Sequence, residues 1–276
     1  MTEHENVNTY ASSTSTSEQP NQHETPQHHE ERHPTGNTFV NILIFIGWLL
    51  LAQIPVVLMI YIMGLSAHMD LITGTLASLL FLLFTGVIIW LVRRYYKSHT
   101  YEQPKKFTKK DVAINIGWAI LLRIIVIGMS QLMFVVTGSR QTQNDKMLLG
   151  DMNGQANMEQ LPQVFPLIVF ALTISFIAPY LEELIYRGIF KETLFKRSRF
   201  WLPFIISSII FASQHGTTNW VAALMYLMMG MIFYLAYHRR GNVRDSMMVH
   251  MIHNGVTGVI IIIGYFAALF LGHIFT

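Results

Sequence analysis

The run VFPLIVFALTISFIAPYLEELIYRGIF, residues 164–190, is almost wholly apolar until it reaches Glu182, Glu183 and Arg187. An apolar stretch of about 20 residues is long enough to cross the ~30 Å hydrocarbon core of a bilayer. Ionisable side chains at membrane depth are costly to place there and are functional by default. The run therefore predicts a membrane-spanning helix that carries a polar site.

Further apolar segments make this helix one of about seven. The chain has 276 residues, of which 52% are hydrophobic and only 13% are charged, whereas a soluble domain carries roughly 25% charged residues. The predicted fold class is therefore an all-α, polytopic transmembrane helix bundle. Its seven spans are expected at residues 39–63, 71–92, 112–136, 164–186, 200–214, 220–237 and 246–275. The fifth is short, and Gly255 and Gly258 could bend the last one or split it in two.

Residues 1–36 have a different composition from the rest of the chain. They contain few apolar residues and many Ser, Thr, Gln, Glu and His residues. Such a segment cannot bury enough apolar surface to offset the entropy lost on ordering. We expect a disordered cytoplasmic tail at residues 1–36 and a membrane domain at residues 37–276, with the chemical motifs within residues 164–272.

The basic residues are concentrated in alternate loops. Three loops, after spans two, four and six, hold 15 of the 19 lysines and arginines. Because cytoplasmic loops are rich in Lys and Arg, we expect a multi-pass protein of the cell membrane with its N-terminus in the cytoplasm. The net charge of +3 is then a topology signal, so the expected partner is the lipid bilayer and not nucleic acid. The chain has no cysteine, which excludes disulfides, thiolate zinc sites and cysteine nucleophiles.

The two adjacent glutamates are expected to differ in role. On a helix, Glu183 and Arg187 are i, i+4 neighbours and can form an ion pair. Glu182 is rotated from Glu183 by about 100° and can face elsewhere. One carboxylate is then structural, and the other is free to act as a general base that deprotonates water.

Two later segments add histidines to this pair. His215 follows Phe211 by one helical turn, and Asn254 follows His250 by the same spacing, so the members of each pair share a face. Imidazole and carboxamide groups can donate hydrogen bonds to a developing oxyanion. His253 lies beside Asn254 and is a further candidate for the same site.

One further charge lies within an apolar segment. Arg123 is in the third predicted span, in the run AILLRIIVIG. A charged residue at this depth is expected to face the bundle interior. We expect a structural partner for it, such as Gln131 or an acidic residue of span four.

The ordered set E-E-x-x-x-R, F-x-x-x-H and H-x-x-x-N resembles the CPBP family of intramembrane proteases. This family includes CAAX prenyl endopeptidases of the Ras-converting type and bacterial Abi or bacteriocin-processing proteins. The resemblance covers roughly residues 164–272. It implies that Glu182 is the catalytic glutamate, that His215 helps to hold the attacking water, and that His250 and Asn254 form the oxyanion site. Glu183, Arg187 and Phe211 are then supporting residues, in a cavity that works without a metal.

The resemblance implies peptide hydrolysis without a cofactor. The sequence contains neither an H-E-x-x-H zinc motif nor a G-x-S-x-G nucleophile elbow. A glutamate with two or three histidines can still bind zinc, so a catalytic zinc is the alternative.

The predicted spans place the catalytic candidates at different depths. Glu182 is expected near the cytoplasmic end of span four, whereas His215 comes about 15 residues, or ~22 Å, into span five. For them to meet, span five has to be tilted, to start deep, or to follow an amphipathic helix at residues 188–199.

Three functions stay open. The first is an intramembrane endopeptidase that acts on a peptide, such as a bacteriocin precursor, or on a membrane-anchored protein. The second is a non-catalytic immunity factor or scaffold that keeps the fold and does not need Glu182. The third is a proton-coupled transporter, although no inverted-repeat pattern favours it. The sequence carries no signal for an oligomeric state.

Overall fold

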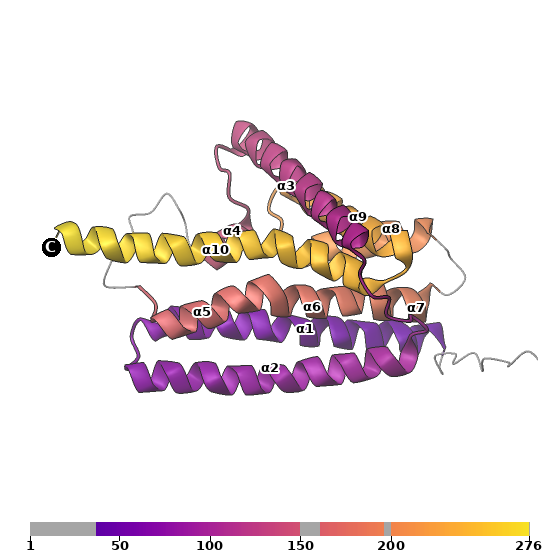
Figure 1. Cartoon of the computed structure of the whole chain (residues 1–276), viewed down its shortest axis with the longest axis horizontal. Helices are drawn as coiled ribbons and strands as arrows, with labels where there is room; N and C mark the ends of the chain where they lie inside the picture. The colour runs from indigo at the N-terminus through magenta and orange to yellow at the C-terminus, as the bar shows by residue number, and fades with distance from the viewer. Residues whose placement is uncertain (1–36, 150–160, 196–199, 276) are drawn as a thin grey trace, which may run out of the picture. The chain divides into compact units, whose positions relative to one another are not determined.

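The structure is a computed structural model that describes residues 37–149, 161–195 and 200–275 (Figure 1). The predicted tail at residues 1–36 lies outside the described residues. Ten α-helices and two π-helical turns make up the described fold, in which no strand occurs. In chain order they are α1 (Thr38–Ser66), α2 (Leu71–His99), α3 (Lys109–Thr137), α4 (Gln143–Leu149), α5 (Val164–Leu172), η2 (Thr173–Ile177), α6 (Ala178–Glu183), η3 (Leu184–Ile189), α7 (Phe190–Leu194), α8 (Trp201–Ser213), α9 (Trp220–Arg240) and α10 (Val243–Phe275).

The helices confirm the predicted all-α transmembrane bundle. Six of the described helical segments are long and apolar enough to cross a membrane: α1, α2, α3, the continuous run Val164–Leu194, α9, and α10. The remaining predicted span, the fifth, corresponds to α8, which has only 13 residues. The chain is therefore a multi-pass membrane protein. The last span is one unbroken helix at Gly255 and Gly258.

Local sequence signals explain where several helices begin and end. The Asp70 side chain accepts hydrogen bonds from the backbone N–H groups of Ile72 and Thr73 at the start of α2. Thr108 and Asp111 form a reciprocal capping box at the start of α3. Such caps satisfy amide donors that have no partner inside the helix. The bounds of α2 and α3 follow from these polar residues as well as from hydropathy.

The fourth span is longer than predicted and is interrupted by two π-helical turns. The short helix α6, which carries both glutamates, lies between η2 and η3. Wide turns of this kind inside helices often mark functional sites. The helix continues to Leu194, so Glu182 is twelve residues, or ~18 Å, from its end and not near it. This corrects the predicted depth, because His215 lies at a similar depth, ~21 Å from the start of α8 at Trp201.

The interior of the bundle is formed mainly by the fourth span and α9. In the most apolar 18-residue segment of each, 61% of the residues are buried, compared with 28% in α1 and α2 and 17% in α3. Helix α9 packs against α3, α8 and α10, and α10 also packs along α5, η2 and α6 (Figure 1). The outer helices direct most of their apolar side chains outward, as expected for helices surrounded by lipid. The fourth span therefore holds Glu182 and Glu183 away from lipid.

Two glycines allow close contacts between helices that bear on the site. A Cβ atom on Gly230 of α9 would lie 2.9 Å from the Cα atom of Ser208 in α8, and one on Gly258 of α10 would lie 2.2 Å from Oγ of Ser175 in η2. Small residues let membrane helices approach each other closely. These contacts bring α8 and α10 near the fourth span and α9.

Candidate active site

A buried ion pair ties the fourth span to its neighbours. Oε1 of Glu183 accepts hydrogen bonds from Nη1 of Arg187 at 3.1 Å and from Nδ1 of His250 at 3.0 Å. Neither charged side chain of the pair has any exposed surface. Arg187 also donates through Nη2 to the backbone oxygen of Gly230 at 2.9 Å. Glu183 and Arg187 thus link the fourth span to α9 and α10.

Aromatic rings enclose this ion pair. The Arg187 guanidinium lies 5.5 Å from the ring centroid of Phe211 and 5.6 Å from that of Phe233. The Phe211 ring also lies 4.4 Å from the ring of His215 and 5.8 Å from the ring of His250. Cations over aromatic faces are stabilised by the ring quadrupole. Phe211 therefore packs between the buried cation and both histidines.

Glu182 has a different environment from its neighbour. Its side chain is 14% exposed, and its Oε2 atom lies 3.9 Å from Nε2 of His250. That buried oxygen has no hydrogen-bond partner among the described residues. A buried carboxylate oxygen without a donor is costly. Glu182 is therefore free of a structural partner at the point where it faces His250.

The contact with Glu183 decides which nitrogen of His250 faces Glu182. The carboxylate accepts hydrogen bonds only, so Nδ1 of His250 carries the proton. In the neutral ring, Nε2 then presents a lone pair toward Glu182. His250 stacks on Phe233 with ring centroids 4.1 Å apart, which holds this orientation. It can donate a hydrogen bond from Nε2 only when the ring is doubly protonated.

His215 is oriented in a similar way. It lies in the turn after α8, with Nδ1 2.7 Å from the backbone oxygen of Phe211. A carbonyl oxygen also only accepts, so Nδ1 donates and Nε2 is left with a lone pair in the neutral ring. The ring stacks on Tyr226 of α9 at 4.4 Å. Tyr226 belongs to no recognisable motif, so the sequence does not predict that it supports His215.

Asn254 is tied to the first π-helical turn. Its Nδ2 atom donates to the backbone oxygen of Ile174 at 3.0 Å. Each carboxamide nitrogen has two hydrogens, so this bond leaves one N–H group of Asn254 for another acceptor. The π-helical turn thereby orients a candidate site residue.

The predicted catalytic residues line one cavity. Glu182, His215, His250 and Asn254 come from α6, the turn after α8, and α10, and they surround a space of about 130 Å3. His253 lines it as well, which the sequence left open. The cavity wall also includes Arg123 of α3 and Asn144 and Asp145 of α4. The sequence pattern does not predict α4, because its seven residues between longer spans show no recognisable periodicity.

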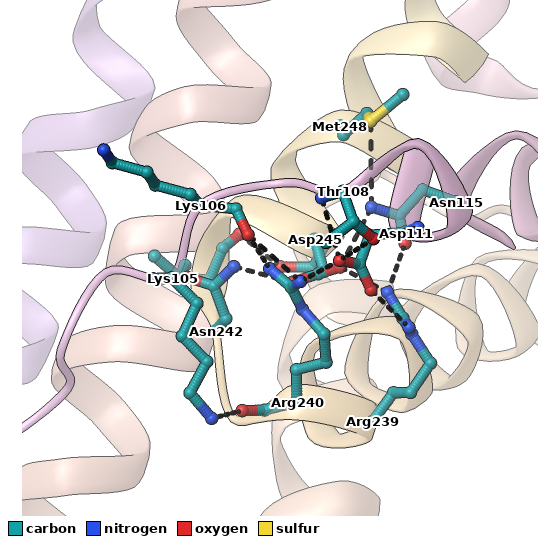
Figure 2. A network of polar contacts seen from close by, with 12 residues as sticks. Lys105, Lys106, Thr108, Asp111, Asn115, Arg239, Arg240, Asn242, Asp245 and Met248 are labelled. Carbon is teal, nitrogen blue, oxygen red and sulfur yellow. Dashed lines mark hydrogen bonds and ion pairs between the residues drawn. The ribbon is translucent and has the colours of Figure 1, made fainter. Parts of the chain in front are cut away.

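A polar network fixes the start of α10, the helix that carries His250 and Asn254 (Figure 2). Asp245 is fully buried and accepts hydrogen bonds from Arg239 at 2.6 Å, Arg240 at 3.0 Å, and Asn242 at 2.7 Å. Asn115 of α3 donates to the same carboxylate at 3.0 Å. Charge-assisted hydrogen bonds of this kind are the stronger ones. The network joins α3, α9 and α10 one to two turns before His250.

No group of three or more His, Asp or Glu side chains in the described part of the chain is arranged to hold a metal ion.

Comparison with known proteins confirms the resemblance that the motifs predicted. Residues 164–256 match the family model described as type II CAAX prenyl endopeptidase Rce1-like. The matched segment contains Glu182, His215, His250 and Asn254.

Several bacterial proteins are similar to this chain. The UPF0177 protein YvdC of Lactococcus lactis is 32% identical over 53% of this chain and 56% of its own length. The putative membrane peptidase YdiL of Bacillus subtilis is 26% identical over 61% of this chain and 64% of its own length. The membrane-embedded CAAX protease MroQ of Staphylococcus aureus is 27% identical over 56% of this chain and 58% of its own length. The chain thus spans less than two thirds of each of these relatives. No solved structure matches it.

Proposed function

We propose that this protein is an intramembrane endopeptidase in which Glu182 activates water for peptide hydrolysis. The observation that carries the proposal is the common cavity of Glu182, His215, His250 and Asn254. These residues come from separate apolar segments, and each of the three motifs supplies at least one of them. The names of the relatives YdiL and MroQ support the same class of activity.

In the proposed reaction, His250 has taken up a second proton on Nε2, 3.9 Å from Oε2 of Glu182, before the substrate binds. A water molecule then donates one hydrogen to Oε2 of Glu182 and the other to the lone pair of His215 Nε2. Glu182 takes one proton from this water, and the remaining hydroxide attacks the scissile carbonyl carbon. Glu182 then returns its proton to the amide nitrogen as the C–N bond breaks, so the products are a carboxylic acid and an amine.

The oxyanion of the tetrahedral intermediate needs hydrogen-bond donors. The second N–H group of Asn254 supplies one, and doubly protonated His250 supplies another. Loss of one such donor typically lowers kcat about 10²- to 10³-fold. Glu183 and Arg187 do not react in this scheme. They hold His250 in the orientation that the reaction needs.

The proposal includes metal independence, because the carboxylate alone activates the water. The substrate is a peptide or a membrane-anchored protein whose scissile bond reaches a cavity inside the helix bundle. The proposal also includes a cytoplasmic N-terminus, which the Lys- and Arg-rich loops support.

The first test compares the peptide ends in cells that express wild-type protein or Glu182→Gln at matched levels, each with and without a chelator. Glutamine keeps the shape of glutamate and cannot accept the proton, so we expect the enzyme-dependent ends to disappear in Glu182→Gln and to survive the chelator. Loss of the ends with the chelator would instead indicate a catalytic metal.

Identical ends in wild type and Glu182→Gln would contradict the protease. If an immunity phenotype persisted in the same variant, the result would favour a non-catalytic scaffold. Proton-coupled flux in vesicles would favour a transporter.

A further inference from the structure

Arg123 is a cation at the middle of a membrane helix. It lies fourteen residues from each end of α3, which corresponds to ~21 Å in either direction. A charged side chain at such depth is costly and normally faces a partner or a water-filled cavity. We therefore expect Arg123 to have a specific partner or to face a cavity.

The structure gives Arg123 a partial partner only. Its Nη2 atom donates to the backbone oxygen of His253 in α10, and its Nε atom is buried without a partner among the described residues. The guanidinium forms no ion pair within the described part of the chain, so neither Gln131 nor an acid of the fourth span is its partner. One backbone oxygen cannot balance a full positive charge.

The guanidinium faces the candidate active site. Arg123 is the only Lys or Arg among the described residues that line the cavity. The cavity also contains the carboxylates of Glu182 and Asp145, and the latter accepts a hydrogen bond from the backbone N–H of Thr142 at 2.9 Å. His215, His250 and His253 face the same space. The cavity thus joins a cation without an ionic partner to the proposed catalytic base.

We propose that Arg123 binds a carboxylate of the substrate inside the cavity in which Glu182 acts. This inference rests on the proposed protease function. The planar guanidinium matches a carboxylate through two parallel hydrogen bonds, and such pairs are strong where water is scarce. The carboxylate is either the free C-terminus of the substrate or an Asp or Glu side chain.

The size of the cavity limits how far that carboxylate lies from the scissile bond. A volume of about 130 Å3 equals that of roughly four liquid waters at ~30 Å3 each. Because Arg123 and Glu182 line the same small cavity, the bound carboxylate and the scissile bond have to lie close together in the substrate. Cleavage is therefore expected within about two residues of a substrate carboxylate.

The first experiment maps cleaved bonds in cells that express wild type, Glu182→Gln, Arg123→Gln or Arg123→Lys. Ser130→Ala is the matched control, because Ser130 lines the cavity from the same face of α3. We expect the Glu182-dependent bonds of wild type and Ser130→Ala to be enriched for a carboxylate within two residues. Arg123→Gln should lose this enrichment.

The second experiment uses purified full-length protein and internally quenched peptides built on a Glu182-dependent cleavage sequence. The peptides carry either the native carboxylates, amides in place of acidic side chains, or an amidated C-terminus. For the form that Arg123 recognises, Arg123→Gln should lower kcat/KM roughly ten- to hundredfold, mainly through KM. Arg123→Lys should lie in between, because lysine keeps the charge and loses the planar fork.

The outcomes separate the two proposals. If no end depends on Glu182, both fail. Glu182-dependent ends without carboxylate enrichment overturn only the role of Arg123. An equal loss on acid and amide peptides would show that Arg123 merely ties α3 to α10, and a loss in kcat alone would point to the oxyanion. If Arg123→Gln does not fold, Arg123→Lys alone decides, since an unchanged preference for the acid peptide would contradict the proposal.

Discussion

At the residue scale, two adjacent carboxylates have opposite surroundings. Glu183 is fully buried, and its Oε1 atom accepts hydrogen bonds from Arg187 and His250. Glu182 is 14% exposed and faces His250 at 3.9 Å, and the Oε2 atoms of both glutamates have no hydrogen-bond partner among the described residues. The cause is the rotation of about 100° between consecutive helical residues. The sequence predicted this division, and the tertiary structure added His250 as the second partner of Glu183.

This division predicts different costs for two equivalent substitutions. Glu183→Gln leaves the Arg187 guanidinium buried without its ionic partner, which typically destabilises a protein by about 3–5 kcal/mol. Glu182→Gln removes no ion pair with Arg187, so we expect its free energy of unfolding to stay within about 1 kcal/mol of wild type. Denaturant unfolding of both purified variants in the same detergent checks this.

A substantial loss of stability in Glu182→Gln, with none in Glu183→Gln, would reverse the roles given to the two residues. Activity does not distinguish them, because Glu183→Gln also removes the acceptor that orients His250.

At the scale of elements, the contact between α10 and the first π-helical turn positions Asn254. Asn254 bonds the oxygen of Ile174, and Gly258, one turn later on α10, lies against Ser175. Hydropathy predicts both segments as membrane helices but contains no information on their relative register. The π-helical turn changes which side chains of the fourth span face α10. This change depends on the packing of side chains between the two helices.

This register predicts that cysteines introduced at positions 175 and 258 form a disulfide. A Cβ atom at Gly258 would lie 3.6 Å from Cβ of Ser175, which is within the range found in disulfides, about 3.5–4.5 Å. The chain has no cysteine of its own, so oxidised Ser175→Cys/Gly258→Cys should lose both free thiols, as counted by alkylation and mass spectrometry. The control Ser175→Cys/Gly255→Cys should keep its thiols, because nothing lies within 4 Å of a Cβ at Gly255. Free thiols in the first pair would show that α10 has a different register.

At the scale of the whole molecule, the fourth span and α9 form the interior, whereas α3 and α10 each present one face to the site and most of their apolar surface outward. In the most apolar 18-residue segments, 61% of the residues are buried in the fourth span and in α9, compared with 17% in α3 and 11% in α10. Arg239 and Arg240, which the sequence analysis used as topology signals, also bind Asp245 at the start of α10 (Figure 2). The same basic residues can therefore serve both orientation and packing.

The orientation is directly testable in a cysteine-free chain. We expect Ser98→Cys, at the exposed end of α2, to react with a membrane-impermeant maleimide only after the cells are permeabilised. Arg140→Cys, in the exposed segment after α3, should react in intact cells. The positive-inside rule is the reason, because the loop after α2 is rich in Lys and Arg. The reverse labelling pattern would place the N-terminus outside.

The sequence by itself determined that this is an all-α membrane protein, approximately where its spans lie, and which residues could form one site, because hydrophobic length and helical spacing are local properties. The tertiary structure alone decided that the fourth span runs on to Leu194, that α4 and Tyr226 border the cavity, and that Arg123 faces it. These features depend on packing between helices distant in the chain. Segments with similar apolar composition pack in many ways, and only close contacts such as Gly258 against Ser175 select one of them.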